Sequence, residues 1–434
     1  MRILLILPYI PYPLDSGGNQ AVFTMVDNLR KSHKVSMLLR GGRKEYIAAL
    51  EHLWPDVEFF VYRGGENMGS WMPLKGRILS YFAGSFARKL NRFFYRYWPA
   101  RRDMDNMLRI RTLNNLRPAD PDYGYCRFVS MISRQGFDMV QTEFSELIGL
   151  CYFLPEDTIK VFVHHEIGFV RKKNELDLLP DPTFEDSVRY ELGKDREISM
   201  LRRYDHIITL TETDRNILSE YIPGERISVS PAVVRIDEAL PFRESGAEFV
   251  FTGGSDHFPN YDGVNWFCEC VLPVMRTKMS GFKVYVVGSW KKKAAKWISA
   301  RYPEVEFTGF VPGLRRFLNG KITVVPVRIG SGMRMKILDA VWSSSPFVTT
   351  TKGVEGQDFT DGKDCIIADT AESFADALVR LSAKADLQRS MADNALRTVS
   401  RMYDPASMLS RRLDVYDRIA SSAGLTGKKG NPIA

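Results

Sequence analysis

Two basic side chains and a carboxylate follow a glycine-containing turn in the second half of this chain of 434 residues. The turn is Gly330-Ser331-Gly332, and Arg334, Lys336 and Asp339 come directly after it. A glycine turn that leads into a helix presents backbone N–H groups and the positive end of the helix dipole, which together suit a phosphate. Arg334 and Lys336 would add two positive charges, and Asp339 would accept hydrogen bonds from ribose hydroxyls. The segment predicts a site for a nucleoside diphosphate, with an ordinary connection between strand and helix as the alternative.

The flanking residues predict the elements that position this turn. An apolar run from Ile322 to Val327 precedes it and is typical of a buried strand. We expect a helix to start near Met333 and to end before Pro346, because proline cannot continue a helix. Phe347 to Thr351 then predicts another strand. The helix would bury an apolar stripe made of Ile337, Leu338, Val341 and Trp342.

The segment from Gly330 to Gly356 resembles the nucleotide-sugar site of the retaining GT-B glycosyltransferases of the GT4 family. Asp339 stands where that family usually has Glu. The residues that match its pattern are Gly330, Gly332, Lys336, Pro346, Val348, Thr350, Gly353, Glu355 and Gly356.

The resemblance implies an α/β protein of the GT-B fold, with two Rossmann-like doubly wound domains that face a central cleft. It also implies a retaining, metal-independent transfer of a sugar from a nucleotide-diphosphate sugar to a hydroxyl of a glycan or lipid-linked acceptor. Cell-surface polysaccharide synthesis is the expected setting. Arg334 and Lys336 would stabilise the departing diphosphate, because fixed cations and N–H dipoles can replace a metal ion.

The start of the chain predicts the first of these domains. Arg2 to Pro8 is a continuous apolar run, as in a central parallel strand, and a helix from Asn19 to Lys31 and a strand from Val35 to Leu39 follow. Gly17 and Gly18 lie at the start of the helix. A simple hinge would explain them, but the family has a similar pair near the donor phosphate, so we assign both to donor binding.

A histidine pair follows the apolar run from Ile159 to Val163. In the family, a strand of the first domain ends in a histidine that contacts the donor sugar. We assign this role to His164, with His165 as the second choice and a structural histidine as the alternative. Glu143, at the end of the preceding strand, would orient an acceptor hydroxyl or be solvated in a loop.

The same resemblance predicts the division of the chain. We expect the first domain in residues 1–230, a linker in 231–246, and a nucleotide-sugar domain in 247–404. A helix in 405–421 would cross back to the first domain, and 422–434 would be a tail.

One loop departs from the family pattern. The strand that opens the second domain runs into Gly253 and Gly254, which we assign to donor binding. Many GT4 members have an Arg and a Lys after such a strand, but this chain has Ser255 and Asp256. The first Glu of the family's Glu-x7-Glu pair is also missing. The loop instead carries Pro-Asn-x-Asp-Gly at 259–263, as in one branch of the family.

A basic segment at 71–111 interrupts the first domain. It carries ten Lys and Arg residues among nine aromatic residues, which is typical of an amphipathic interfacial segment. Three interpretations stay open: contact with an anionic membrane, packing on the first domain, or a groove for an anionic acceptor. The net charge of +8 also favours an anionic partner. We expect no nucleic acid, because no recognisable RNA-binding signature accompanies the segment.

The remaining features bound the protein class. Five cysteines without metal-ligand spacing predict reduced thiols. No apolar run has the length of a membrane span. We therefore expect a cytoplasmic protein, which would be peripheral to the inner face of the membrane if 71–111 binds it. We expect no cofactor and no metal, because no Asp-x-Asp pair lies at either predicted crevice. Two other functions stay open: a nucleotide-sugar 2-epimerase of GT-B fold, and a non-enzymatic protein that binds membranes or polyanions.

Overall fold

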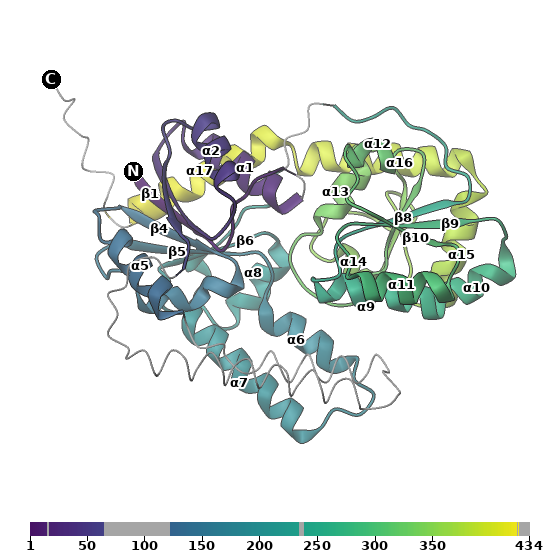
Figure 1. Ribbon diagram of the computed structural model, residues 1–434, viewed down its shortest axis with the longest axis horizontal. Coiled ribbons are helices and arrows are strands. Elements are labelled where there is room, and N and C mark those ends of the chain that lie inside the picture. The colour runs from purple at the N-terminus through teal and green to yellow at the C-terminus, as the bar shows by residue number, and fades with distance from the viewer. Residues whose placement is uncertain (15–16, 65–121, 234–237, 423, 425–434) are drawn as a thin grey trace.

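Two parallel sheets lie side by side in the computed structural model, which describes residues 1–14, 17–64, 122–233, 238–422 and 424 (Figure 1). The first sheet has seven strands in the order β3-β2-β1-β4-β5-β6-β7, and the second has six in the order β10-β9-β8-β11-β12-β13. Helices cover both faces of each sheet. This arrangement confirms the predicted pair of Rossmann-like doubly wound domains.

The strands of the first sheet are apolar on both faces, since helices cover both. Ile3, Leu5 and Leu7 of β1 pack in one cluster, whereas Leu4 and Ile6 pack in another on the opposite face. The strands are β1 (Arg2–Leu7), β2 (Lys34–Arg40), β3 (Glu58–Tyr62), β4 (Met139–Glu143), β5 (Ile159–His164), β6 (His206–Thr209) and β7 (Ile227–Val229). The helices are α1 (Gly17–Leu29), α2 (Lys44–Leu53), α5 (Tyr123–Ser133), α6 (Gly168–Asp177), α7 (Phe184–Leu201) and α8 (Glu212–Ser219), with short 3-10 turns at Ser145–Tyr152 and Gly224–Arg226.

The second domain repeats this plan. Its strands are β8 (Glu248–Thr252), β9 (Lys283–Val287), β10 (Val305–Gly309), β11 (Ile322–Val325), β12 (Phe347–Thr349) and β13 (Ile366–Ile367). Its helices are α9 (Phe258–Trp266), which continues through a π turn at Phe267–Val271 into α10 (Leu272–Lys278), then α11 (Lys292–Arg301), α12 (Leu314–Leu318), α13 (Met335–Trp342), α14 (Thr351–Val354), α15 (Ala371–Ser382) and α16 (Ala385–Met402). The predicted helix after the glycine turn is therefore present as α13, and it buries Ile337, Leu338 and Val341.

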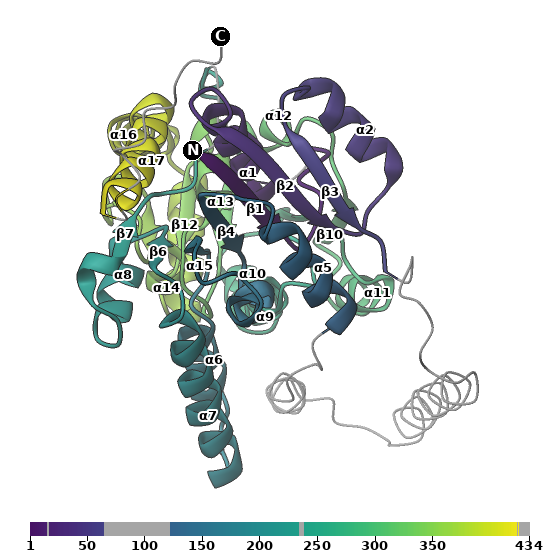
Figure 2. The same cartoon turned by 90° about the vertical axis from the view of Figure 1, so that its left-hand side faces the viewer.

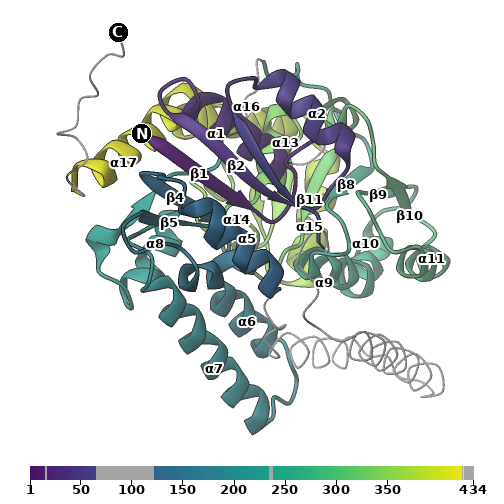
Figure 3. The ribbon, with the colours of Figure 1, turned by 60° about the vertical axis from the view of Figure 1, so that its left-hand side comes forward.

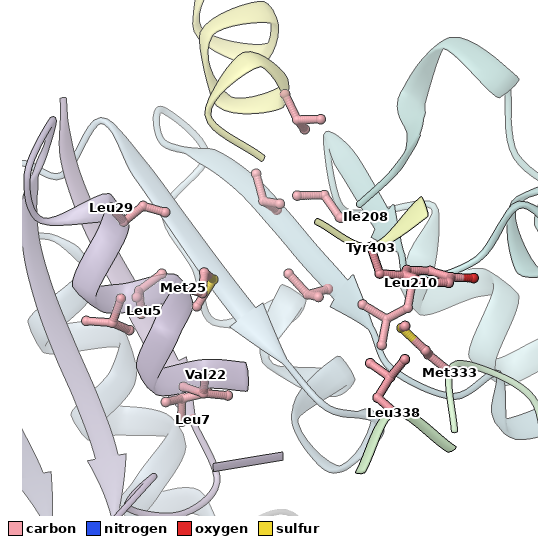
Figure 4. Close-up of a cluster of buried hydrophobic side chains, with 14 of the residues drawn as sticks. Leu5, Leu7, Val22, Met25, Leu29, Ile208, Leu210, Met333, Leu338 and Tyr403 are labelled. Carbon is pink, nitrogen blue, oxygen red and sulfur yellow. The ribbon is translucent and has the colours of Figure 1, made fainter. Parts of the chain in front are cut away.

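The last helix, α17 (Pro405–Ser422), returns to the first domain. It lies along α1 (Figure 1), and its Arg412 donates from Nε to Ser230 Oγ at 2.6 Å. Tyr416 is fully buried there. One apolar cluster runs from Leu5 and Met25 of the first domain to Leu338 of the second (Figure 4). The two domains thus share part of their core.

Helices α6 and α7 form a hairpin that projects from the first domain (Figures 2 and 3). Of these two helices, α6 was not predicted from the sequence. A capping box starts α7, in which the Thr183 and Asp186 side chains each bond the other's backbone N–H. Leu176 and Leu179, near the end of α6, pack with Phe258 and Ile329 of the second domain. The hairpin is therefore a second contact between the domains.

Two predictions fall largely or wholly outside the described residues. The basic segment 71–111 is one of them, and all of the predicted tail 422–434 except Ser422 and Gly424 is the other. None of the helices in the described parts of the chain combines the length and the apolar character that a membrane span requires. All five cysteines are free thiols, as predicted.

Candidate functional site

The first turns of α1 and α13 face each other between the domains. A Cβ atom added to Gly17 would lie 2.9 Å from Met335 Cβ and 4.0 Å from Asp339 Oδ2. Only a residue without a side chain allows this approach. Gly18 lies next to it, and a Cβ there would be 3.7 Å from the Tyr9 hydroxyl. The predicted glycine pair and the predicted ribose acceptor thus lie close together where α1 meets α13.

Lys336 lies half-buried in the first turn of α13. Its Nζ donates to Asn260 Oδ1 at 2.7 Å and stands 4.1 Å from the centre of the Phe251 ring. Burial lowers the pKa of this ammonium to about 7, and the charge of Arg334 acts in the same direction. An ammonium with so little counter-charge is a strong attractor for an anionic ligand.

Asp339 lies about one turn further along α13. Burial raises the pKa of its carboxyl to about 6, although the positive charges of Arg315 and Lys336 oppose the change. The carboxylate lies beside Gly17, with its Oδ2 4.0 Å from the position of a Cβ there. Its role as a ribose acceptor stays a prediction.

The glycine turn before α13 is held by the first domain. Gly330 N donates to Asn174 Oδ1 at 3.1 Å, and Ser331 Oγ accepts from Ile167 N at 2.7 Å. A Cβ on Gly332 would lie 2.0 Å from His165 O. In this arrangement the Gly330 N–H does not point at an open phosphate site, as the sequence analysis expected, because α6 supplies an acceptor for it. That acceptor is on a helix which the sequence analysis did not predict.

Arg334 also differs from the expectation of a cation directed at the donor. Its guanidinium donates to the carbonyl oxygens of Ser331 and Gly332, the latter at 3.1 Å. Burial lowers its pKa. Glu166 lies nearby; burial alone would raise its pKa, but His257, Arg171 and Arg334 together lower it to about 2. Arg334 therefore stabilises the turn, with Glu166 as an acidic neighbour, and Lys336 is the cation whose ammonium contacts Asn260 instead.

The two histidines of the predicted pair lie in different surroundings. The His164 side chain has no exposed area, and its Nε2 is 3.0 Å from Glu197 Oε1. His165 retains 23% exposure, and its Nε2 is 2.9 Å from Glu143 Oε2. Successive residues at the end of a strand point to opposite faces of the sheet, so only one of the pair can reach the cleft. The structure favours His165, the second choice, for contact with a ligand.

A buried network holds the imidazole of His165. Glu143 is 1% exposed, and it accepts a hydrogen bond of 2.7 Å from Gln141 Nε2. Gln141 in turn accepts from the Tyr416 hydroxyl of α17. The His165 ring stacks on Phe144 with centroids 4.0 Å apart. The solvation in a loop that was open for Glu143 is thereby excluded, because its carboxylate is buried and paired.

Phe144 has a φ of 71°, in the left-handed region that favours glycine. A bulky residue there costs about 1–3 kcal/mol and persists where surrounding contacts impose it. Its ring lies between His165 and Tyr9, the latter 5.2 Å away between centroids. A cavity of about 30 Å³ beside His165 has the volume of one water molecule. The backbone is thus strained where the first domain meets the cleft.

Gly253 and Gly254 approach the site through Asn260. The Asn260 Nδ2 donates to Gly254 O at 3.0 Å, and Trp290 Nε1 donates to Gly253 O at 2.8 Å. Gly253 has a φ of 141°, and a Cβ on it would lie 2.6 Å from the Asn260 amide nitrogen. The two glycines therefore fit the backbone around Asn260, a residue that the sequence analysis noted in a motif but did not assign to the site.

Within the described residues, no group of three or more His, Cys, Asp or Glu side chains is arranged to hold a metal ion. Gly17 lies beside Asp339, and Gly254 is joined to Lys336 through the Asn260 amide, so the predicted glycines gather around the first turns of α13. His165 lies on the first-domain side, next to Gly332. His164 lies apart from them in the core.

Comparisons with known proteins identify the family of the second domain. Residues 246–384 match the family model described as "Glycosyl transferases group 1". A curated relative, an uncharacterized 44.6 kDa protein in the cps region of Klebsiella pneumoniae, is 24% identical over 169 residues. That match covers 37% of this chain and 44% of the relative, so it spans less than half of either.

Solved structures match over nearly the whole chain. TarM from S. aureus, in a complex with UDP, is 11% identical over 96% of this chain and 99% of its own, with a TM-score of 0.65. Anabaena HepE with UDP and glucose is also 11% identical, over 96% of this chain and 100% of its own, with a TM-score of 0.61. WaaG, a glycosyltransferase involved in lipopolysaccharide biosynthesis, is 14% identical over 95% and 99%, with a TM-score of 0.56. The chain has the GT-B fold, and its second domain matches the group 1 glycosyltransferase model.

Proposed function

We propose that this protein is a retaining, metal-independent glycosyltransferase of the GT4 family. It transfers a sugar from a nucleotide-diphosphate sugar to a hydroxyl of a glycan or lipid-linked acceptor. The observation that carries the proposal is the meeting of α1 and α13, where Asp339 lies beside Gly17 and Lys336 belongs to the same first turns of α13; the donor would bind in a crevice at this point between the domains. A cation suits a diphosphate and a carboxylate suits ribose hydroxyls, so the two side chains fit a nucleoside diphosphate.

Lys336 is the residue that stabilises the departing diphosphate in this proposal. Its pKa of about 7 means that it gains its full charge as an anion binds. The positive ends of α1 and α13 add to the field at the same point, because both helices begin at the crevice. Fixed charges and dipoles of this kind stabilise a leaving group without reorganising during the reaction.

His165 replaces His164 as the residue that contacts the sugar. It lies next to Gly332, the turn that precedes α13, so a sugar attached to the diphosphate can reach its ring. Because Glu143 holds Nε2, the ring presents Nδ1 to the ligand. Glu143 itself is too deeply buried to orient an acceptor hydroxyl directly.

The setting of the reaction is part of the proposal. The relative from the cps region and the neighbour involved in lipopolysaccharide biosynthesis support a role in cell-surface polysaccharide synthesis. We place the enzyme in the cytoplasm, where nucleotide sugars would reach it. The basic segment 71–111 would then bind either the inner face of the membrane or an anionic acceptor.

Thermal unfolding with UDP, GDP, ADP and dTDP sugars tests the proposal. A ligand at about 100 times its dissociation constant adds roughly 2.7 kcal/mol to the free energy of unfolding. We expect one nucleotide class to raise the melting temperature of the wild type and of Lys291→Ala, which removes an exposed lysine of the same domain. Lys336→Ala should lose the shift. The absence of any shift in a folded wild type would refute donor binding.

A further inference from the structure

The Pro-Asn-x-Asp-Gly segment at 259–263 makes contacts that the proposed function does not use. Its Asn260 is 8% exposed and bonds two groups at once. The amide oxygen accepts from Lys336 Nζ at 2.7 Å, and the amide nitrogen donates to Gly254 O at 3.0 Å. The side chain is therefore fixed at one end by the β8 backbone and at the other by the ammonium.

The rest of the motif joins the same two loops. Asp262 accepts two hydrogen bonds from the guanidinium of Arg328, at 2.7 Å and 3.1 Å. A Cβ on Gly263 would lie 2.6 Å from Pro326 O, so the start of α9 packs directly on the backbone that leads to the glycine turn. Three consecutive contacts thus fix the loop after β8 against the segment that ends in Lys336.

The choice of an amide at this position has an electrostatic consequence. Ser255 and Asp256 stand where many members of the resembled family have cations, so Lys336 carries more of the charge needed for a diphosphate. An ammonium has three donors, and a neutral acceptor uses one of them without cancelling the charge. A carboxylate in the same place would form an ion pair and weaken the field at the ligand.

We propose that Asn260 is the positioning residue for Lys336: its amide directs the ammonium toward the donor diphosphate and leaves the positive charge uncompensated. This inference rests on the proposed function, since it concerns the same crevice. Gly253 and Gly254 serve it too, because a side chain on Gly253 would displace the Asn260 amide.

The charges around Lys336 agree with this role. Burial lowers the pKa of Lys336 most, and the positive charge of Arg334 lowers it further. The negative charge of Asp339 raises it by less, so the pKa falls to about 7. Asn260 adds no charge to this balance. A change from Asn to Asp adds one negative charge at the shortest contact that the ammonium makes.

Isothermal titration with UDP, GDP, ADP and dTDP, using the full chain, measures the effect on binding. We expect Asn260→Ala to weaken the nucleotide that binds best by about tenfold or more, because the ammonium loses its fixed position. Asn260→Asp should weaken it further. Asn319→Ala is the control, because it removes a partly buried amide that bonds Pro241 O and Ser343 O in the same domain.

A second readout needs no nucleotide. In protein labelled at lysine Cε, NMR should show one lysine that titrates near pH 7 in the wild type, and Lys336→Arg should abolish this signal. Asn260→Asp should move the titration to higher pH, whereas Asn319→Ala should leave it in place. Looser packing around Lys336 would also raise its pKa by relieving burial, so the reference is Asn260→Ala: the titration in Asn260→Asp should lie above that in Asn260→Ala.

The outcomes separate the two proposals. Weaker nucleotide binding in both Asn260 variants, with a raised lysine titration in Asn260→Asp, supports the inference. Unchanged binding in Asn260→Ala, or an unchanged titration in Asn260→Asp, overturns it and leaves the donor site standing. If the folded wild type binds none of the four nucleotides, the proposed function fails, and the role of Asn260 in donor binding fails with it.

Discussion

The two sheets have the same plan, but their carboxyl edges carry different chemistry. The edge of the first sheet presents His165 with Phe144 and Tyr9, backed by the buried carboxylate of Glu143. The edge of the second presents glycine turns and the ammonium of Lys336, held by neutral amide and aromatic groups.

This difference separates two tasks in a transfer reaction. A diphosphate that gains charge as it leaves needs a cation, and among the residues that the structure describes the second edge offers Lys336 for this task. A sugar and an acceptor hydroxyl are neutral and need directed hydrogen bonds and an apolar surface, which the first edge supplies. Each sheet thus contributes one carboxyl edge, and the side chains at the two edges suit different parts of the substrates.

The largest effect should come from the second edge. Lys336→Met should lower the rate of donor turnover by about 10²–10³, equivalent to about 2.7–4 kcal/mol of lost transition-state stabilisation. It should also weaken the binding of the free nucleoside diphosphate. Release of nucleoside diphosphate from the sugar donor measures the rate, and calorimetry measures the binding. Equal losses in Lys291→Ala would show that the effect is not specific to the crevice.

His165→Asn tests the first edge. We expect turnover to fall by roughly 10², while the affinity for the nucleoside diphosphate stays near that of the wild type, because the ring lies away from Lys336. His164→Asn should instead lower the melting temperature, since His164 is buried against Glu197. The comparison between the two edges breaks down if His165→Asn weakens the nucleotide as much as Lys336→Met does.

A paired glycine experiment tests the contact between the edges. Gly332 and Gly362 have φ values of 76° and 71°, but a Cβ on Gly332 would meet His165 O at 2.0 Å, whereas one on Gly362 meets nothing within 4 Å. Gly362→Ala should cost about 1 kcal/mol of stability from backbone strain alone. Gly332→Ala should cost more and should also lower turnover by tenfold or more, because the turn must move away from His165. If Gly332→Ala lost no more stability and no more activity than Gly362→Ala, the contact between Gly332 and His165 O would have no direct role.

The pH dependence of binding tests whether the charge of Lys336 at the second edge attracts the nucleotide. The pKa of Lys336 is lowered to about 7 in the free protein, so the protonated form that an anion prefers is present below pH 7 and is lost above it. The affinity for a nucleotide sugar should therefore fall as pH rises from 7 to 9, by at most about tenfold per unit. Lys336→Arg should remove this dependence, because a guanidinium stays charged. A flat profile in the wild type would contradict the assignment.

The smallest effect concerns the support of the first edge. Tyr416→Phe removes the hydroxyl that bonds Gln141, and we expect a loss of about 1 kcal/mol in stability. Turnover should fall by a factor of about five or less, because Gln141 still holds Glu143. Glu143→Gln removes the charge next to His165 and should have the larger effect on turnover. The reverse order would mean that α17, not the carboxylate, orients the imidazole.

The sequence predicted the elements on which the site is built. The apolar run at Ile322, the proline at 346 and the stripe on α13 each act within a few residues, so they can be read from one segment. The strand that ends at the histidine pair was predicted for the same reason. The two-domain architecture followed from repeated units of this kind and from the resemblance.

Contacts between residues that lie far apart in the chain could not be predicted from the sequence. Both faces of β5 are covered, so no apolar alternation shows which of His164 and His165 turns toward the cleft. The alternation of Gln141 and Glu143 in β4 was the available signal that a polar network lies behind one of them. Asn260 is 76 residues from Lys336, and only the folded chain brings them together.

The return of α17 to the first domain also bears on synthesis. Val415, Tyr416 and Ile419 are buried against residues near the beginning of the chain. On the ribosome, the first sheet emerges early but stays uncovered on that face until the entire second domain has been translated. A nascent chain that stalls before residue 405 would expose a sticky apolar surface. The core of the first domain can therefore be completed only after both halves have been translated.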